Sequence, residues 1–208
     1  MKNKKKIYKP IKLKYYMALG LIAWLIIIVI VIIIVWIIGM FIYYYNRFAV
    51  LENRIENSAS QIDVQLKKRA DLVPNLVKTV QGYAKHEKGI MADVTKARAE
   101  MLKAGNLSSR VKAGNALQEA LGKIFAIAEN YPQLKANENF LQLQTELASI
   151  EDKVAYSRQY YNDSVLSYDN ATSVIPGVWF FHLYGKQKKD YIKIEEAEKA
   201  VPNVNFEE

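Results

Sequence analysis

The hydrophobic pattern of the chain begins with an apolar run from Met17 to Tyr45 that contains no charged residue. A helix needs about 20 residues to cross the hydrocarbon core of a bilayer, so this run is long enough to span it. Backbone groups in lipid find no water to bond, which predicts a helix. A cleaved signal peptide is the alternative, but its apolar core would be only about 7 to 15 residues long. The aromatic residues of the predicted anchor are Trp24, Trp36, Tyr43, Tyr44 and Tyr45.

From Asn46 to Leu102 apolar residues recur every three or four positions between charged ones, which predicts helices with one buried stripe. No turn signal separates this segment from the apolar run, so we expect the anchor to continue into the domain. Pro74 predicts a kink. The polar stretch between Gly82 and Gly89 is the candidate reversal if the segment is two helices. The stripe consists of Leu51, Ile55, Ala59, Ile62, Leu66, Val73, Leu76, Val80, Tyr83, Val94, Ala97 and Met101.

Two more long helices are predicted downstream. One runs from about Ser109 to Asn130, with Ser108 or Ser109 as its cap, and the other from Asn137 to about Asn170, capped by Asn137. The strongest strand candidate, residues 173–175, is short and leads into a Pro-Gly turn. The expected fold class is therefore all-α. A single transmembrane helix is followed by an up-and-down antiparallel bundle of four helices, or of three if the first is long and kinked.

The basic residues divide the chain unevenly. Seven lysines and no acidic residue precede the apolar run, and removing them from the total leaves 22 Lys plus Arg against 21 Asp plus Glu. Under the positive-inside rule the N-terminus is expected in the cytoplasm and the bundle outside, with the opposite topology as the alternative. The lysines are Lys2, Lys4, Lys5, Lys6, Lys9, Lys12 and Lys14.

Charge and composition also limit the possible functions and partners. A nucleic-acid protein would carry its basic face on the folded domain, so no nucleic-acid partner is expected, and the basic tail points to anionic membrane lipid. The chain has no cysteine, which excludes disulfides and thiolate chemistry. The expected domains are a basic cytoplasmic tail (1–16), a transmembrane helix (17–45), a helical bundle (46–170), and an aromatic and basic segment with an acidic tail (171–208).

No constellation of residues predicts catalysis. His86 precedes a glutamate, but a zinc-protease helix needs a second histidine at position 90, which is Ile90. Dimetal carboxylate sites use Glu-x-x-His pairs, and none is present. Asp63, Arg69 and Asp71 fit either a buried polar cluster or exposed pairs between turns. We therefore expect no enzyme, no cofactor and no metal. The carboxylate pairs considered are Glu52 with Glu56 and Glu138 with Glu146.

The segment after Pro176 combines aromatic rings with lysines. This pairing is expected where rings enter the headgroup layer and cations meet lipid phosphate, and the same rings equally fit a cap on the open end of the bundle. With four helices after the anchor the segment returns to the membrane, and with three it lies at the far end. The candidate contact residues, to membrane or to a partner, are Trp179, Phe180, Phe181, Tyr184, Lys186, Lys188 and Lys189.

Three blocks of the chain resemble the LemA family of bacterial membrane proteins. They are LENRIENSASQIDVQLKKRADLVPNLVKTVQGYAKHE (51–87), ALGKIFAIAENYPQLKANENFLQLQTEL (120–147) and YSRQYYNDSVLSY (156–168). The resemblance implies an N-terminal anchor, an antiparallel helix bundle and no enzymatic activity. Some relatives are described with the bundle in the cytoplasm, and relatives are often encoded near membrane proteases of the heat-shock type.

These observations leave two function classes. The first is a membrane-anchored scaffold or adaptor that self-associates, binds another membrane protein such as a protease, or does both. Assistance to membrane-protein quality control is one role that such a scaffold could serve. The second is an extracytoplasmic sensor or binding module that holds a small ligand between helices. Self-assembly without ligand favours the first class, and a monomer whose melting temperature rises with a metabolite favours the second.

Overall fold

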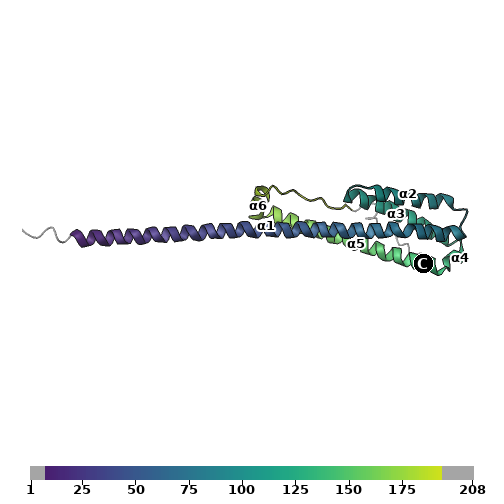
Figure 1. Cartoon of the computed structure of the whole chain (residues 1–208), viewed down its shortest axis with the longest axis horizontal. Coiled ribbons are helices and arrows are strands. Elements are labelled where there is room, and N and C mark those ends of the chain that lie inside the picture. Colours follow the sequence, from purple (N-terminus) through teal and green to yellow (C-terminus); the bar gives the residue numbers. More distant parts are fainter. Residues whose placement is uncertain (1–7, 194–208) are drawn as a thin grey trace, which may run out of the picture.

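The computed structural model describes the fold of residues 8–193 and the side chains of residues 14–193. This described part is helical and contains no strand, which confirms the all-α prediction. A long helix projects to one side of a bundle formed by its own second half and the helices that follow (Figure 1). The helices are α1 (Tyr8–Tyr83), α2 (Lys88–Lys103), α3 (Leu107–Ala128), α4 (Pro132–Lys135), α5 (Glu138–Ser173) and α6 (Gly177–Leu183).

The helix α1 is continuous over 76 residues, which corresponds to a length of about 114 Å. It is already helical at Tyr8, so nine residues of the expected tail, 8–16, belong to the same helix. No break separates the apolar run from the amphipathic part near Asn46, as the absence of a turn signal predicted. The anchor and the first bundle helix are therefore one rod.

The chain reverses between Tyr83 and Lys88, in the polar stretch that the two glycines bracket. This decides between the alternatives in favour of four long helices, because the distal half of α1, α2, α3 and α5 follow each other up and down. The short α4 sits in the connection between α3 and α5. At the distal end the Asn137 side chain, which caps α5 as predicted, also donates to the Tyr83 hydroxyl at 3.0 Å.

The first turns of α3 and α5 are capped by different arrangements. The cap of α3 is Asn106, which accepts a bond from the Ser109 backbone N–H, while the Ser109 hydroxyl accepts one from the Asn106 backbone. The predicted cap was Ser108 or Ser109, and this prediction was wrong by two or three residues. Residues 173–175, where a strand was considered, form no strand, because Ser173 is the last residue of α5 and Val174 is its C-terminal cap.

The core is built from the stripe that the sequence predicted. Nine of its twelve members are buried in one cluster, half-buried Ala59 and Ala97 pack against the others, and Tyr83 at the end of α1 is exposed. Close approach of α1 and α3 occurs at Gly114, where a Cβ atom would lie 2.6 Å from a methyl group of Leu66. The close approach of α1 and α5 is made by small residues, since the hydroxyls of Ser58 and Ser164 are 3.4 Å apart.

Pro74 lies inside α1, and the helix continues past it without interruption. Proline has no N–H, so it leaves the carbonyl of Ala70, one turn earlier, without its usual helical partner. Ala70 is fully buried, and an unpaired carbonyl there would be costly. Arg98 of α2 supplies the missing donor, because its Nε bonds the Ala70 carbonyl oxygen at 2.7 Å. The proline therefore creates a docking point for α2 in place of a helix break.

Replacement of Arg98 by alanine should lower the free energy of unfolding by about 1 to 3 kcal/mol, since it leaves this buried carbonyl unpaired. The loss should be smaller when Pro74→Ala is also present, because the new backbone N–H can then bond the same carbonyl. Thermal melting of the four members of this double-mutant cycle measures the coupling. Equal losses in both backgrounds would show that Arg98 acts elsewhere.

Candidate membrane-facing site at the base of the bundle

From Met17 to Ile38, α1 is not covered by any other part of the described chain. The large apolar side chains from Met17 to Ile38 are all exposed, including Trp24 and Trp36. Among the described residues, α1 is the one helix that is long and apolar enough to cross a membrane. Soluble monomeric proteins rarely expose a continuous apolar surface of this size. This part of α1 therefore needs lipid or another protein around it.

The short helix α6 packs on α1 where the apolar run ends and the bundle begins (Figure 1). The ring of Phe180 stacks on Tyr44 with centroids 4.9 Å apart and planes at 9°. The Tyr184 hydroxyl donates to the carbonyl of Phe41 at 2.7 Å, and its ring also meets that of Tyr45 edge-on. The aromatic segment therefore lies at the base of the bundle, the location that four helices after the anchor predict.

The corner that leads into α6 requires a glycine. A Cβ atom at Gly177 would lie 2.1 Å from the carbonyl oxygen of Ala171 and 3.4 Å from the Tyr44 ring. The preceding Ile175–Pro176 peptide bond is cis. This corner turns the chain sharply from α5 back onto α1. Pro176 and Gly177 predict the turn, but the short helix α6 that follows it was not predicted.

The rings of α6 point to different surroundings. Phe181 is buried and contacts Tyr168, so it belongs to the core and is not available to a bilayer or a partner. Trp179 and Leu183, one helical turn apart, are 64% and 66% exposed. The neighbouring Ile175 is also exposed. The exposed apolar side chains at this corner are Val174, Ile175, Trp179 and Leu183. We call Ile175, Trp179 and Leu183 the apolar rim, and it is the candidate for a membrane or partner contact. The rings of Phe180 and Tyr184 are half-buried and pack against α1.

The three lysines after α6 are also divided. Lys186 lies 2.5 Å from a carboxylate oxygen of Glu52, in a partly buried ion pair between the C-terminal segment and α1. Lys188 and Lys189 follow on an extended segment that runs along the bundle away from α6 (Figure 1). Lys188 is exposed and Lys189 is half-buried. Of the three lysines predicted to meet lipid or a partner, Lys186 is therefore held in the ion pair with Glu52, and Lys188 and Lys189 are not part of this ion pair.

A small polar network ties this extended segment to the bundle. The Tyr168 hydroxyl lies 3.2 Å from Glu52 and 3.1 Å from the Gln187 carbonyl. Burial, together with the nearby Glu52 carboxylate, raises the pKa of Tyr168, so the phenol stays protonated. Further along, the Asn162 amide pairs with both backbone groups of Ile192 at 3.0 Å. These contacts join residues at least 19 positions apart, and no local pattern predicts them.

We expect the exposed rim to contact lipid. In a variant with Trp24→Phe and Trp36→Phe, Trp179 is the single tryptophan of the chain. Its fluorescence should be quenched in liposomes by lipids brominated close to the headgroup, because tryptophan favours that layer. The further change Leu183→Ser should weaken this quenching while the helical circular dichroism is unchanged. Tryptophan emission typical of water, without quenching at any depth, would assign the rim to a protein partner.

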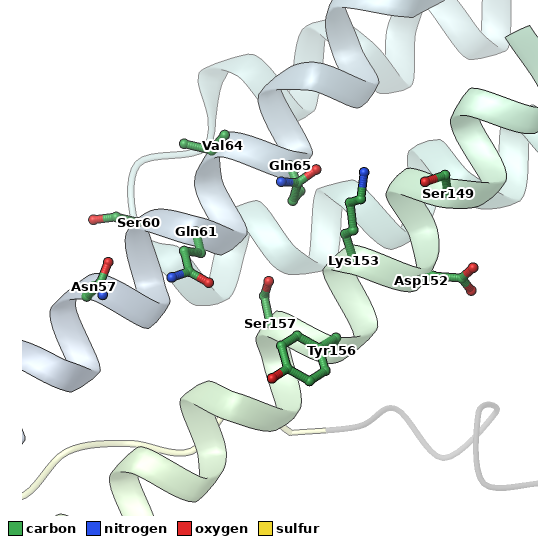
Figure 2. Close-up of a pocket in the computed structure, with 10 residues that line it drawn as sticks. All are labelled: Asn57, Ser60, Gln61, Val64, Gln65, Ser149, Asp152, Lys153, Tyr156 and Ser157. Atoms are coloured by element: carbon green, nitrogen blue, oxygen red, sulfur yellow. The ribbon is translucent and has the colours of Figure 1, made fainter.

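A second candidate site is an open groove between α1 and α5, with a volume of about 650 Å³. Its walls carry amides and hydroxyls, and Gln61, Gln65 and Lys153 extend into the space between the two helices (Figure 2). The side-chain oxygen of Gln65 is buried and has no hydrogen-bond partner within the described chain. The groove also exposes Tyr156. These groups offer hydrogen bonds to a polar ligand but no nucleophile paired with a base.

Deeper in the bundle, Arg69 is a buried cation with 2% of its surface exposed. It donates to the Gly114 carbonyl at 3.3 Å, and its Nε has no partner among the described residues. Burial lowers the pKa of Arg69, and Glu151 partly opposes this shift. The other two members of the predicted polar cluster lie apart from it. Asp63 binds Arg110 through two bonds of 2.7 Å, and Asp71 pairs with Lys67 on the surface.

No group of three or more His, Asp or Glu side chains in residues 14–193 is placed to hold a metal ion. His86 lines a groove between α1 and α2, and Glu138 and Glu146 lie on the exposed side of α5. Glu52 is engaged by Lys186 and Tyr168. The described side chains therefore offer binding surfaces, and they do not assemble a recognisable catalytic group.

Comparison with known proteins gives a consistent family. The LemA family model matches residues 58–206. Magnetosome protein MamQ of Magnetospirillum gryphiswaldense is 25% identical over 71% of this chain and 64% of its own length. MamQ 2 of Paramagnetospirillum magneticum is 24% identical over 74% of this chain and 66% of its length. Protein LemA of Metamycoplasma hominis is 25% identical over 64% of this chain and 63% of its length.

The chain thus spans slightly less than two thirds of the length of these relatives. None of their names describes an enzymatic activity. The family match covers most of the bundle and continues through the segment after α6, while the apolar half of α1 precedes it. With this single apolar helix at its N-terminus and the helical bundle behind it, the chain is a membrane-associated protein that belongs to the LemA family.

Proposed function

We propose that this chain is a membrane-anchored scaffold or adaptor without enzymatic activity. Its bundle presents lateral surfaces to copies of itself and to another membrane protein, for which a membrane protease is one candidate. Assistance to membrane-protein quality control is a process in which such an adaptor could serve. By the lysine distribution, the bundle stands on the extracytoplasmic side of the cell membrane.

The observation that carries the proposal is the continuity of α1 from the apolar run into the bundle. A flexible linker would let the domain sample many orientations, whereas one helix holds it upright. The packing of α6 against Phe41 and Tyr44 stiffens the junction further. Copies in the same membrane then meet in a fixed orientation, which lowers the entropic cost of lateral association.

The test is the mass of the purified full-length chain in detergent and in lipid, without added ligand. We expect particles that contain more than one copy of the chain. The fraction of chains in such particles should rise with the protein-to-lipid ratio. A chain that remains monomeric at every ratio, and whose melting temperature rises when a metabolite is added, would contradict the scaffold and support a sensor.

The sensor is the second candidate, and the groove of Figure 2 is the observation that favours it. The side-chain oxygen of Gln65 is buried without a partner in the described residues, and a ligand that donates a hydrogen bond could satisfy it. In this case Gln65→Leu should remove the ligand-induced rise in melting temperature. Under the scaffold proposal the same change should leave the assembly intact.

A further inference from the structure

A second groove lies between α1 and α2 at the end of the bundle that is distant from the anchor. Its volume is about 910 Å³, and Val77 and the buried Met91 give it an apolar floor. Among the described residues, none that lines it is a carboxylate. We call it the cationic groove, and its basic residues are Lys85, His86, Lys88 and Lys96.

The distal half of α5 has the opposite character. Between Glu138 and Asp152 it carries four carboxylates and no basic side chain. Leu141 lies among them and is 46% exposed, although it is a large apolar residue. We call the exposed surface of Glu138, Leu141 and Glu146 the acidic α5 face. Around the helix, Glu138 lies at the middle of this exposed surface, with Leu141 toward one edge and Glu146 toward the other. The surface therefore carries negative charge beside one exposed apolar residue, and the cationic groove carries positive charge above an apolar floor.

The two surfaces stand at the same distance from the anchor. The Asn137 amide is 3.0 Å from the Tyr83 hydroxyl, so the start of α5 is level with the end of α1. Lys85 and Lys88 follow Tyr83 within the same reversal. Glu138 is therefore level with the lysines at the distal end of the cationic groove.

The spacing of the charges also matches. Both α2 and α5 run from the distal end back toward the anchor, because α2 follows the reversal and α5 leads to α6 (Figure 1). Glu138 and Glu146 are eight residues apart on α5, and Lys88 and Lys96 are eight residues apart on α2. Each separation corresponds to about 12 Å along a helix. Two upright copies can therefore bring the carboxylates of one to the same heights as the lysines of the other.

We propose that the occupant of the cationic groove is the acidic α5 face of a second copy of this chain in the same membrane. The inference rests on the proposed scaffold function and names the surfaces that assemble it. Leu141 of one copy lies against the mouth of the groove above Met91 of the next, and Glu138 and Glu146 stand at the heights of Lys88 and Lys96. Because the two surfaces differ, the contact is heterologous, and it repeats into rings or open rows.

The charge pairs allow a test by reversal and rescue. Donor- and acceptor-labelled full-length chains in phosphatidylcholine liposomes report association by energy transfer. Lys88→Glu with Lys96→Glu should weaken association at least about tenfold, since it places like charges at both contacts. Glu138→Lys with Glu146→Lys should do the same. A mixture of these two double variants should regain the wild-type signal, because each contact is then complementary again.

The matched control reverses Lys103 and Lys112, two exposed lysines outside the cationic groove. It makes the same change of net charge and should associate as the wild type does. Circular dichroism of each variant checks that the helices are formed. Loss of association in both double variants without recovery in the mixture would overturn the proposed pairing, because a general charge or folding effect has no reason to depend on these partners.

Cross-linking gives an independent readout, since the chain has no cysteine of its own. Ala92→Cys in the cationic groove combined with Leu141→Cys should form a ladder of disulfide-linked copies, and either change alone should form none. Double variants that associate like the wild type, with no ladder, would overturn these surfaces and leave the scaffold proposal standing. A wild-type chain without energy transfer in liposomes would overturn both.

Discussion

Leu66→Ala is expected to lower the free energy of unfolding of the bundle by about 2 to 5 kcal/mol, the usual cost of truncating a buried leucine. Leu66 is 2% exposed and fills the contact of α1 with Gly114 of α3. The melting temperature should fall by roughly 5 to 15 °C for a domain of this size. The measurement is thermal circular dichroism of the full chain in detergent. Val64→Ala is the matched control, because Val64 is exposed on the same helix.

A second substitution at the same contact separates packing from other effects. Gly114→Ala should destabilise the wild type, since the added Cβ forces the Leu66 methyl group to move. In the Leu66→Ala background that methyl group is absent, and alanine is better than glycine inside a helix by about 1 kcal/mol. The same change should therefore stabilise the truncated chain. An effect of the same sign in both backgrounds would contradict the packing seen at Gly114.

Replacement of the seven N-terminal lysines by glutamine is expected to abolish or reverse the preferred orientation in the membrane. Lysine and arginine within about 15 to 20 residues of a span set its direction, and the twenty residues after Phe41 offer only Arg47 and Arg54. A cysteine introduced at the exposed Ala155 reports the side of the bundle. In spheroplasts it should react with a membrane-impermeant maleimide when the lysines are present, and much less when they are replaced.

The control for this experiment is the same labelling after lysis, which should be equal for both chains. Protection of the cysteine in intact spheroplasts, with labelling only after lysis, would place the bundle in the cytoplasm. The lysines lie in residues 1–14, of which the first seven are outside the described part of the chain. The orientation therefore rests on the charge distribution alone.

The sequence was sufficient for the features that depend on local pattern. The apolar run, the buried stripe of α1 and the Asn137 cap each follow from residues close together in the chain. The reversal near residue 85 was one of two alternatives, because glycines and polar residues permit a turn without requiring it. The packing of α2 against α3 and α1 in the structure shows that the chain reverses there, which gives four helices in the bundle.

The features that the sequence did not predict depend on residues far apart. Arg98 resembles any surface arginine until α2 is placed beside the carbonyl that Pro74 leaves unpaired. Arg69 falls beside the apolar stripe, where its burial could be considered but not distinguished from exposure. Trp179 and Phe181 are two residues apart in one aromatic run, and only the packing of α6 separates an exposed ring from a core ring.

The most direct test of the scaffold is the number of copies that assemble in a native membrane. Full-length chains carrying a fluorescent label at natural abundance can be counted by single-molecule photobleaching in isolated membranes, without purification or added ligand. We predict that most fluorescent spots lose their signal in several steps, and that Lys88→Glu with Lys96→Glu shifts them toward fewer steps. If nearly all spots bleach in a single step, the chain is a monomer in its membrane, and this result would contradict the scaffold.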